Sequence, residues 1–164
     1  MDSRGRHSSA GGVREVRVRD LDRVAALWTA ITAHHAPLDP LWRMRAGSGD
    51  AVRSLLGDLQ ADPEAAIWVY EERGDLPGMC IVRIDRSPPI LEETRRAEIT
   101  DIGVREDRRR QGIASALLEE ALHWVDCRRV SRVEVQVARA NAEGQAFWRA
   151  RGFDPLMDVL HKRL

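Results

Sequence analysis

The residue types best suited to chemistry in this chain gather in one short turn, Arg109 to Ser115. A turn that opens a helix binds anions, because the first backbone N–H groups of a helix lack partners and the helix dipole adds positive charge there. Gly112 and Ala114 are small enough for a ligand to approach the main chain, and Arg109 and Arg110 add charge-assisted hydrogen bonds. Together with the hydroxyl of Ser115, these groups predict a phosphate site.

The alternative is a purely structural turn, in which Arg108 to Arg110 are solvated and Gly112 serves chain geometry. Position favours the phosphate site, since the turn follows an expected strand and precedes the clearest helix pattern in the chain. Other phosphate or nucleophile motifs do not occur: there is no GxxxxGKS/T, no GxGxxG near the first strand and no GxSxG. No metal site is expected, because the adjacent His34 and His35 point to different sides of a helix.

The elements that position this turn follow from apolar periodicity and from turn residues along the chain. Strands are expected over Val13–Arg19, Ile67–Tyr70, Met79–Asp85, Ala97–Val104 and Val133–Val137, with one or two more in Phe153–Leu164. Helices are expected over Leu21–His34 after the cap Asp20, over 51–60 after the cap Asp50, from Ile113 to Val125, and from the cap Asn141 to Arg151. The order β-α-α-β-β-β-α-β-α-β predicts a mixed sheet with helices packed on its faces.

The composition places these elements in one soluble domain. The chain has 164 residues, of which 43% are hydrophobic and 32% charged, as is typical of a single globular core. No apolar run approaches the ~20 residues that cross a bilayer. Residues 1–12 are predicted to be a disordered leader without the apolar core of a signal peptide, so a cytoplasmic location is expected.

Charge and cysteine content exclude several classes of function. The 26 basic and 26 acidic residues give a formal net charge of zero, which argues against nucleic-acid and membrane-surface partners. Cys80 and Cys127 lie far apart without CxxC spacing and indicate neither a disulfide framework nor a zinc site. The only lysine, Lys162, is the third residue from the end, so Schiff-base and P-loop chemistry are not expected.

Two motifs resemble one known family. The stretch Arg109-Arg110-Gln111-Gly112-Ile113-Ala114 is similar to the Q/R-x-x-G-x-G/A motif of the GNAT superfamily of acyl-CoA-dependent N-acetyltransferases. Residues 141–153 resemble the N-x-x-A-x-x-F-Y-x-x-x-G-F ending of that family, with Gly144 in place of the common alanine. The resemblance implies a single N-acetyltransferase domain over residues 13–164. Its fold would be α+β (mixed α/β): a central mixed, mostly antiparallel sheet of six to seven strands with four helices packed on its faces.

The resemblance also implies how acetyl-CoA would bind. Main-chain amides across Arg110–Ser115 would hold the pyrophosphate, and the strand edge at Ile102–Val104 would pair with the pantetheine arm. That strand would splay from Arg132–Ala138 to admit the acyl group, and Asn141 would serve the cofactor, a helix cap, or both. The residues expected to bind the cofactor are Ile102, Gly103, Val104, Arg109, Arg110, Gln111, Gly112, Ile113, Ala114, Ser115, Asn141 and Trp148.

For catalysis the resemblance implies direct transfer of the acetyl group to an amine, with a carboxylate as general base. Asp101 and Glu98 lie on the relevant strand, and three residues apart in a regular strand they face opposite sides, so only one is expected in the site. Asp101 is favoured over Glu98. Trp148 stands where many relatives carry the tyrosine that protonates the thiolate, so here the thiolate would leave unassisted or take its proton from water.

The acceptor site is expected in two loops, 34–45 and 88–96. Its candidate side chains are Trp28, His35, Asp39, Trp42, Glu92 and Glu93, which suit a cationic amine, and Arg43, Arg45, Arg95 and Arg96, which suit an amino acid with a carboxylate. Two other functions stay open: a non-catalytic acyl-CoA sensor, favoured by Trp148, and a weaker nucleic-acid module that uses Arg108 to Arg110. Relatives are often homodimers, but no feature of the sequence fixes an interface.

Overall fold

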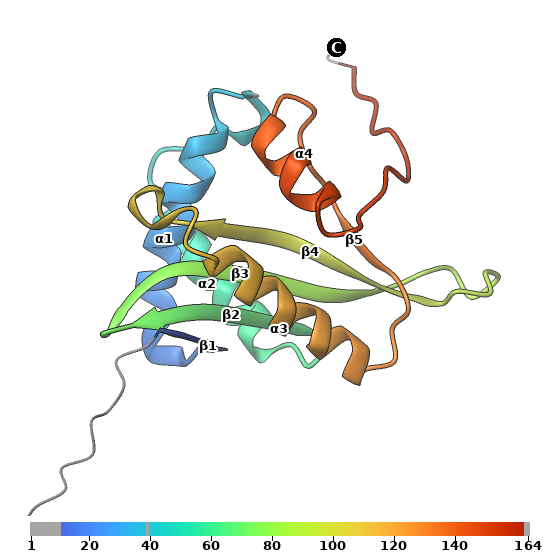
Figure 1. Ribbon diagram of the computed structural model, residues 1–164, viewed down its shortest axis with the longest axis horizontal. Helices are drawn as coiled ribbons and strands as arrows, with labels where there is room; N and C mark the ends of the chain where they lie inside the picture. Colours follow the sequence, from blue (N-terminus) through green and yellow to red (C-terminus); the bar gives the residue numbers. More distant parts are fainter. Residues whose placement is uncertain (1–10, 39, 163–164) are drawn as a thin grey trace, which may run out of the picture.

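The computed structural model describes residues 11–38 and 40–162, which form one sheet with helices on both faces (Figure 1). Its five strands lie in sequence order, and neighbours are antiparallel except β4 and β5, which are parallel. The strands are β1 Gly12–Glu15, β2 Ala65–Glu72, β3 Asp75–Arg86, β4 Arg95–Val104 and β5 Val133–Val135. Residues 1–10 of the predicted leader lie outside the described residues, whereas Gly12 already belongs to β1.

Helices cover both faces because the central strands are apolar on both sides. The helices α1 (Leu21–His35) and α2 (Gly49–Ala61) pack on one face, and α3 (Ile113–Cys127) packs on the other. In β3, Met79 and Ile81 join the core under α1 and α2, while Cys80 and Val82 join the core under α3, as alternation along a strand requires. The helix α4 (Ala142–Arg149) follows β5. Three short 3-10 helices complete the description: η1 Val18–Asp20, η2 Pro40–Trp42 and η3 Glu106–Arg108.

The predicted α+β architecture, with a mostly antiparallel sheet and four helices, is confirmed. The expected strand count is wrong, because the described sheet has five strands and residues 153–162 form none. Phe153 instead turns back onto α4: its amide donates to the carbonyl of Trp148 at 3.2 Å, and the two rings pack edge to face. Pro155 follows, and a proline cannot donate a hydrogen bond to a neighbouring strand. The apolar Met157 and Leu160 are therefore left 74% and 91% exposed.

Asp20 is the N-cap residue of α1, as predicted, whereas Asp50 is not the N-cap of α2. Asp20 precedes α1 but makes no side-chain cap bond to it; its carboxylate accepts from the amide of Arg17 at 2.9 Å and from Arg14 at 2.7 Å. These bonds fold residues 18–20 into η1, so the first strand ends at Glu15 instead of Arg19. Helix α2 begins at Gly49, which places Asp50 inside its first turn instead of at its cap.

A β-bulge in β4 changes which way its side chains face. Ile99 pairs with Val82 and Asp101 pairs with Ile81, so Thr100 is an extra residue in the ladder. Val82 lies on the α3 face of β3 and Ile81 on the α1 face. Asp101 is therefore turned to the α1 face, opposite to Ile99.

The parallel pairing of β4 with β5 is short. It joins Ala97–Ile99 to Val133–Val135, and beyond Ile99 the two strands have no pairing in the described part of the chain. The expected strand to Val137 ends early, because the carbonyls of Val137 and Ala138 accept hydrogen bonds from the Gln145 side chain of α4, at 3.3 and 3.5 Å. The strands thus splay at their carboxyl ends.

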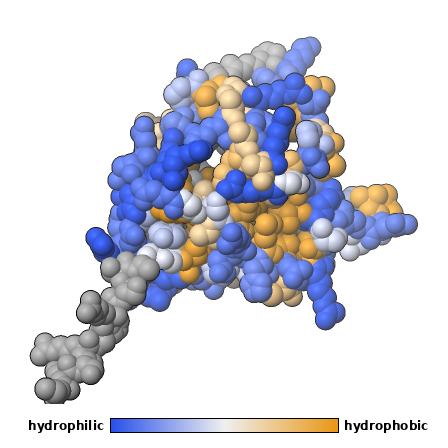
Figure 2. All heavy atoms as spheres, viewed as in Figure 1, coloured by the Kyte–Doolittle hydropathy of each residue, from blue (hydrophilic) through white to orange (hydrophobic). Residues whose placement is uncertain are grey.

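The face of the molecule shown in Figure 2 is hydrophilic around its edges, with hydrophobic residues in its centre and at the tip of the β3–β4 hairpin. That tip carries Ile90 and Leu91, which are 89% and 51% exposed. Among the described helices, none has the length and apolar character needed to cross a membrane.

Candidate active site

A cleft of about 640 Å³ lies at the carboxyl end of β4, where this strand parts from β5. The last turns of α1, the first turn of α3, and α4 with the chain before it contribute its walls. Most residues expected at the site line this cleft: Asp101, Ile102, Gly103, Val104, Arg109, Arg110, Gly112, Ile113, Ala114, Ser115, Asn141 and Trp148. Two do not, Glu98 and Gln111.

The turn before α3 has the backbone of an anion cradle. Gly112 is the N-cap residue with φ at 81°, and Arg110 has φ at 61°, so the chain passes twice through the left-handed region. The first helical bond runs from the amide of Ala116 to the carbonyl of Gly112 at 3.0 Å. The amides of residues 113–115 precede that bond, so the helix supplies no acceptor for them. Their position at the cleft is suited to an anion.

The arginines of the turn differ in their partners. Arg108 forms an ion pair with Glu72 and donates to the side chain of Gln111 at 3.1 Å. Arg109 donates to the carbonyl of Val104 at 3.3 Å, and its guanidinium lies 3.3 Å from Nε2 of His34 on α1. Because an arginine only donates, that imidazole nitrogen is the acceptor. Arg109 therefore links the end of α1 to the turn.

Arg151 is a further cation at the cleft that sequence reasoning did not single out. It donates to the hydroxyl of Ser115 and, at 3.0 Å, to the carbonyl of Phe147, and its guanidinium lies 3.6 Å from the centre of the Phe147 ring. These contacts hold its charge beside the first turn of α3. The available signal was the spacing of Phe147 and Arg151, which puts them on one side of a helical turn.

Glycine allows close packing at two positions around the cleft. A Cβ atom on Gly103 would lie 2.6 Å from Ile31, so glycine lets α1 approach β4. A Cβ atom on Gly144 would lie 2.5 Å from Nδ2 of Asn141. The Asn141 side chain accepts from the amide of Gly144 at 2.9 Å, which is the N-cap predicted for α4.

The two candidate carboxylates lie on the same face of β4, contrary to the expectation from a regular strand. In the ladder with β3, Glu98 pairs with Arg83 and Asp101 pairs with Ile81. Arg83 and Ile81 face the same way, so their partners do too. The extra residue at Thr100 shifts the alternation of side chains by one and brings Asp101 to the face of Glu98. Arg83 binds Glu98 at 2.8 Å, and Gln136 donates to it at 3.3 Å. Asp101 reaches the cleft, where Nε1 of Trp28 donates to its Oδ1 at 2.8 Å.

The surroundings of Asp101 suit a proton acceptor. Burial raises the pKa of this carboxyl, and hydrogen bonds from Thr100 and Trp28 oppose the rise. His35 lies close enough to lower the pKa of Asp101 through its charge, whereas Glu98 raises it. Asp101 is thus a partly buried acid whose pKa lies above its usual value, as general bases commonly require.

Comparison with known proteins supports the assignment of the family. The sequence model of the acetyltransferase (GNAT) family matches residues 28–153, which include the cradle, β4 and α4. The chain belongs to the GNAT family. No curated protein sequence gives a significant match.

Solved structures show the same fold at low sequence identity. A mutant of the BH1408 protein from Bacillus halodurans is 21% identical with a TM-score of 0.82, over 93% of this chain and 98% of that chain. A predicted acetyltransferase from Clostridium acetobutylicum, solved with acetyl-CoA, is 14% identical with a TM-score of 0.76, over 94% and 96%. An aminoglycoside 6'-N-acetyltransferase from Acinetobacter baumannii is 16% identical with a TM-score of 0.75, over 94% and 98%.

This GNAT protein departs from the family motif at Trp148. Its side chain is only 6% exposed and packs edge to face between Phe147, at 5.1 Å, and Phe153, at 4.8 Å between ring centres. The indole belongs to the core under α3 and also lines the cleft. The only tyrosine of the sequence, Tyr70, belongs to β2 and does not line the cleft.

The expected acceptor residues separate into three groups. Trp28, His35 and Trp42 line the cleft. Arg43 and Arg45 line a second, adjacent cavity of about 550 Å³ that shares Trp42 with the cleft. None of the hairpin candidates, Glu92, Glu93, Arg95 and Arg96, lines either cavity. Asp39 lies outside the described residues.

The positions of the potential metal ligands can be compared in the part of the chain that the structure describes. In the two ranges 11–38 and 40–162, no group of three or more His, Cys, Asp or Glu side chains is placed to hold a metal ion. His34 and His35 are neighbours on α1, and His34 faces Arg109 instead of a carboxylate.

Proposed function

We propose that this GNAT protein is an N-acetyltransferase that transfers the acetyl group of acetyl-CoA directly to a primary amine. The observation that carries the proposal is one continuous cleft that has an anion cradle at the start of α3 and a partly buried carboxylate, Asp101, on β4. The related fold from Clostridium acetobutylicum was solved with acetyl-CoA, and an aminoglycoside N-acetyltransferase of this fold was solved with CoA. Both support acetyl-CoA as the donor.

The cleft residues fit this donor. Main-chain amides of residues 110–115, with Arg109, Arg110 and Arg151, suit the charge of the pyrophosphate. The unpaired edge of β4 at residues 102–104 offers backbone groups to the amides of the pantetheine arm, as a neighbouring strand would. Asn141 already caps α4 through its carbonyl oxygen, and its amide nitrogen stays available to the donor.

The proposed reaction begins with proton transfer from the substrate ammonium group to the carboxylate of Asp101. The neutral amine then attacks the thioester carbonyl and a C–N bond forms. The nitrogen of the tetrahedral intermediate releases its extra proton to water, and the C–S bond breaks to give the amide and the thiolate. The leaving thiolate takes its proton from water, because Trp148 carries no acidic hydroxyl. A thiol pKa of about 8.5 makes the thiolate a tolerable leaving group.

Calorimetry with coenzyme A tests the cradle. A Gly112→Trp protein must place a residue with a side chain at φ of 81°, which distorts the turn. Loss of one or two charge-assisted hydrogen bonds lowers affinity by about tenfold or more. Equal affinity of the variant and the wild type would contradict the assigned cradle.

A second candidate function is a non-catalytic acyl-CoA sensor, favoured by the absence of a tyrosine among the lining residues of the described cleft. Release of thiol from acetyl-CoA, measured over a panel of primary amines, separates the two functions. Thiol release that depends on an amine supports the transferase. Binding of coenzyme A without turnover on any amine supports the sensor.

A further inference from the structure

The half of the cleft next to α1 is walled by apolar and aromatic groups. Trp28 and Ile31 come from α1, and Trp42 comes from η2. His35, at the end of α1, packs its ring against that of Trp42, with 6.2 Å between the ring centres. Met79 of β3 borders this part of the cleft and is completely buried. Such walls bind an aromatic or apolar body better than a hydrated polar one.

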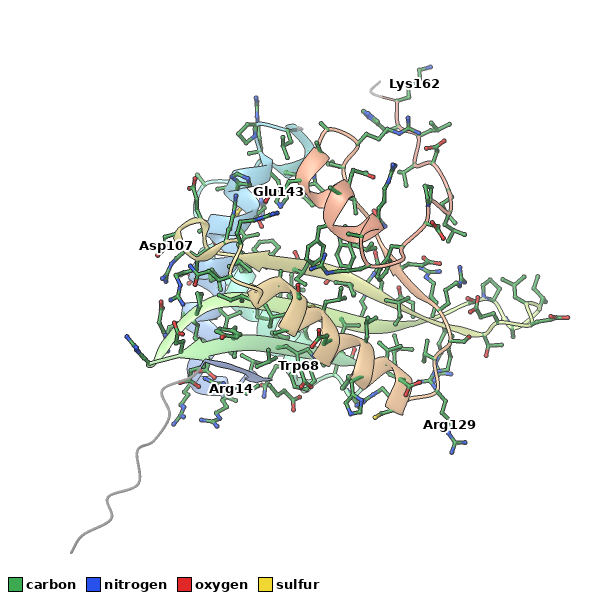
Figure 3. The ribbon with its side chains drawn as sticks, in the orientation of Figure 1. Arg14, Trp68, Asp107, Arg129, Glu143 and Lys162 are labelled. Carbon is green, nitrogen blue, oxygen red and sulfur yellow. The ribbon has the colours of Figure 1, made fainter. Side chains whose placement is uncertain are left out.

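The charge in this half is sparse and mixed. Among the described lining residues, Asp101 and Glu143 are the carboxylates, and Glu143 is an exposed residue in the first turn of α4 (Figure 3). Arg109 lies beside His34 of α1 and brings a positive charge to the same region. A substrate with several ammonium groups would find one partly buried carboxylate, Asp101, and one exposed carboxylate, Glu143.

The surroundings of Asp101 suit the binding of a single ammonium group. The indole N–H of Trp28 donates a hydrogen bond to Oδ1 of Asp101 at 2.8 Å, and this bond orients the carboxylate. Burial, followed by the nearby His34 and Arg109, lowers the pKa of His35, while Asp101 opposes this shift. The His35 ring packs against Trp42 as part of the wall. The nearest other acid on this face, Glu98, is held by Arg83.

We infer that the acceptor is a monoamine with an aromatic or apolar body, which lies against Trp28 and Trp42 while its single ammonium group reaches Asp101. The inference rests on the proposed transferase function and names its substrate class. Polyamines, aminoglycosides and amino acids with a free carboxylate are then poor acceptors. Arg43 and Arg45, which would suit a carboxylate, line the adjacent cavity instead.

The test uses 2-phenylethylamine as the monoamine, compared with spermidine, kanamycin and phenylalanine. Turnover with acetyl-CoA is expected to give a kcat/KM for 2-phenylethylamine at least about tenfold above each of the others, the scale of one aromatic contact. Calorimetry on protein saturated with coenzyme A is expected to detect 2-phenylethylamine and to detect no binding of spermidine.

Matched variants locate the effect. Trp42→Leu is expected to raise KM for 2-phenylethylamine about tenfold while coenzyme A affinity is retained, which also reports a folded protein. Trp124→Leu is the control, because Trp124 lies on α3, outside the cleft, and stacks with Arg128 at 3.7 Å. It should leave both constants unchanged.

The possible results distinguish the two proposals. Preference for spermidine or kanamycin overturns the monoamine inference and leaves the transferase intact. Binding of 2-phenylethylamine without turnover on any amine overturns the transferase and keeps the acceptor pocket. An equal effect of Trp42→Leu and Trp124→Leu on KM overturns the assigned wall.

Discussion

At the scale of the residue, Asp101 and Glu98 illustrate how similar acids on one strand acquire different surroundings. Both face the α1 side of β4, yet Glu98 is engaged by Arg83 and Gln136 and does not line the cleft. Asp101 lines the cleft, and burial raises its pKa. Both side chains are carboxylates, so their different surroundings come from the residues that contact them.

Replacement of these two acids tests which one is the base. Asp101→Asn removes the proton acceptor and is expected to lower kcat by about 100-fold or more with coenzyme A affinity unchanged. Glu98→Gln keeps the shape of the side chain and breaks only its ion pair with Arg83, so kcat should fall severalfold at most. Steady-state kinetics on both proteins decide the assignment, and a larger loss in Glu98→Gln would reverse it.

The hydrogen bond from Trp28 to Asp101 predicts a shift in the pH dependence of activity. The bond stabilises the charged carboxylate, so its loss in Trp28→Phe raises the pKa of Asp101. A base must be ionised, and activity is lost as pH falls through its pKa. The acid limb of kcat/KM should therefore move to higher pH in the variant, by about one pH unit.

The control for this shift is Trp124→Phe, which changes an indole on α3 outside the cleft. Its pH profile should match that of the wild type. An unchanged acid limb in Trp28→Phe, with activity merely lower at every pH, would show that Trp28 serves packing alone.

At the scale of the element, the site depends on where β4 and β5 stop pairing. Ile99 is the last residue of β4 that pairs with β5, and the bulge at Thr100 follows it directly. The alternation of side chains along β4 therefore shifts by one residue at the point where β4 separates from β5. Gln145 of α4 takes the carbonyls of Val137 and Ala138 and so keeps the following chain out of the sheet. A three-residue pairing thus leaves the edge of β4 open to a ligand.

The helix α4 also supplies a prediction about the cradle. Arg151, just after α4, donates to Ser115 in the first turn of α3 and lines the cleft. Arg151→Ala should weaken coenzyme A binding about tenfold, because a guanidinium beside a phosphate makes charge-assisted bonds. Arg149→Ala is the matched control, since Arg149 is exposed and does not line the cleft. Isothermal calorimetry on the two variants checks this, and equal losses would exclude a specific role for Arg151.

At the scale of the whole molecule, the two faces of the sheet form separate cores, and β3 lies between them. Cys80 of β3 is completely buried, and burial raises the pKa of its thiol well above the usual value. Cys127, at the end of α3, is exposed. The two thiols therefore report on the fold independently of any activity.

Thiol labelling with a disulfide reagent tests this arrangement. The native protein should react at Cys127 alone, because reaction requires an accessible thiolate. Cys80 should react only after unfolding, so a Cys127→Ser protein should label at the rate of global or local opening. Rapid labelling of two thiols in the native protein would contradict the described packing of β3.

Much of the fold, and most of the residues that line the cleft, could be predicted from local sequence. The periodicity of α1 and α3 was recognisable, and so was the cap at Asn141, because amphipathic stripes and caps depend on neighbours a few residues apart. The one or two strands predicted within Phe153–Leu164 were wrong, because a β-prone segment becomes a strand only with a partner, and Phe153 packs on Trp148 instead. The roles assigned to cofactor and catalytic residues stay predictions.

The sequence by itself determined the turn at Arg109–Ser115, since a glycine, small residues and arginines before a helix start act within one loop. Only the tertiary structure decided what faces that turn. The bond from Trp28 to Asp101 joins residues 73 apart, and the bond from Arg151 to Ser115 joins residues 36 apart. The face of Asp101 was set by a bulge whose register depends on β3. Contacts between distant elements depend on how whole surfaces pack, and no local pattern records them.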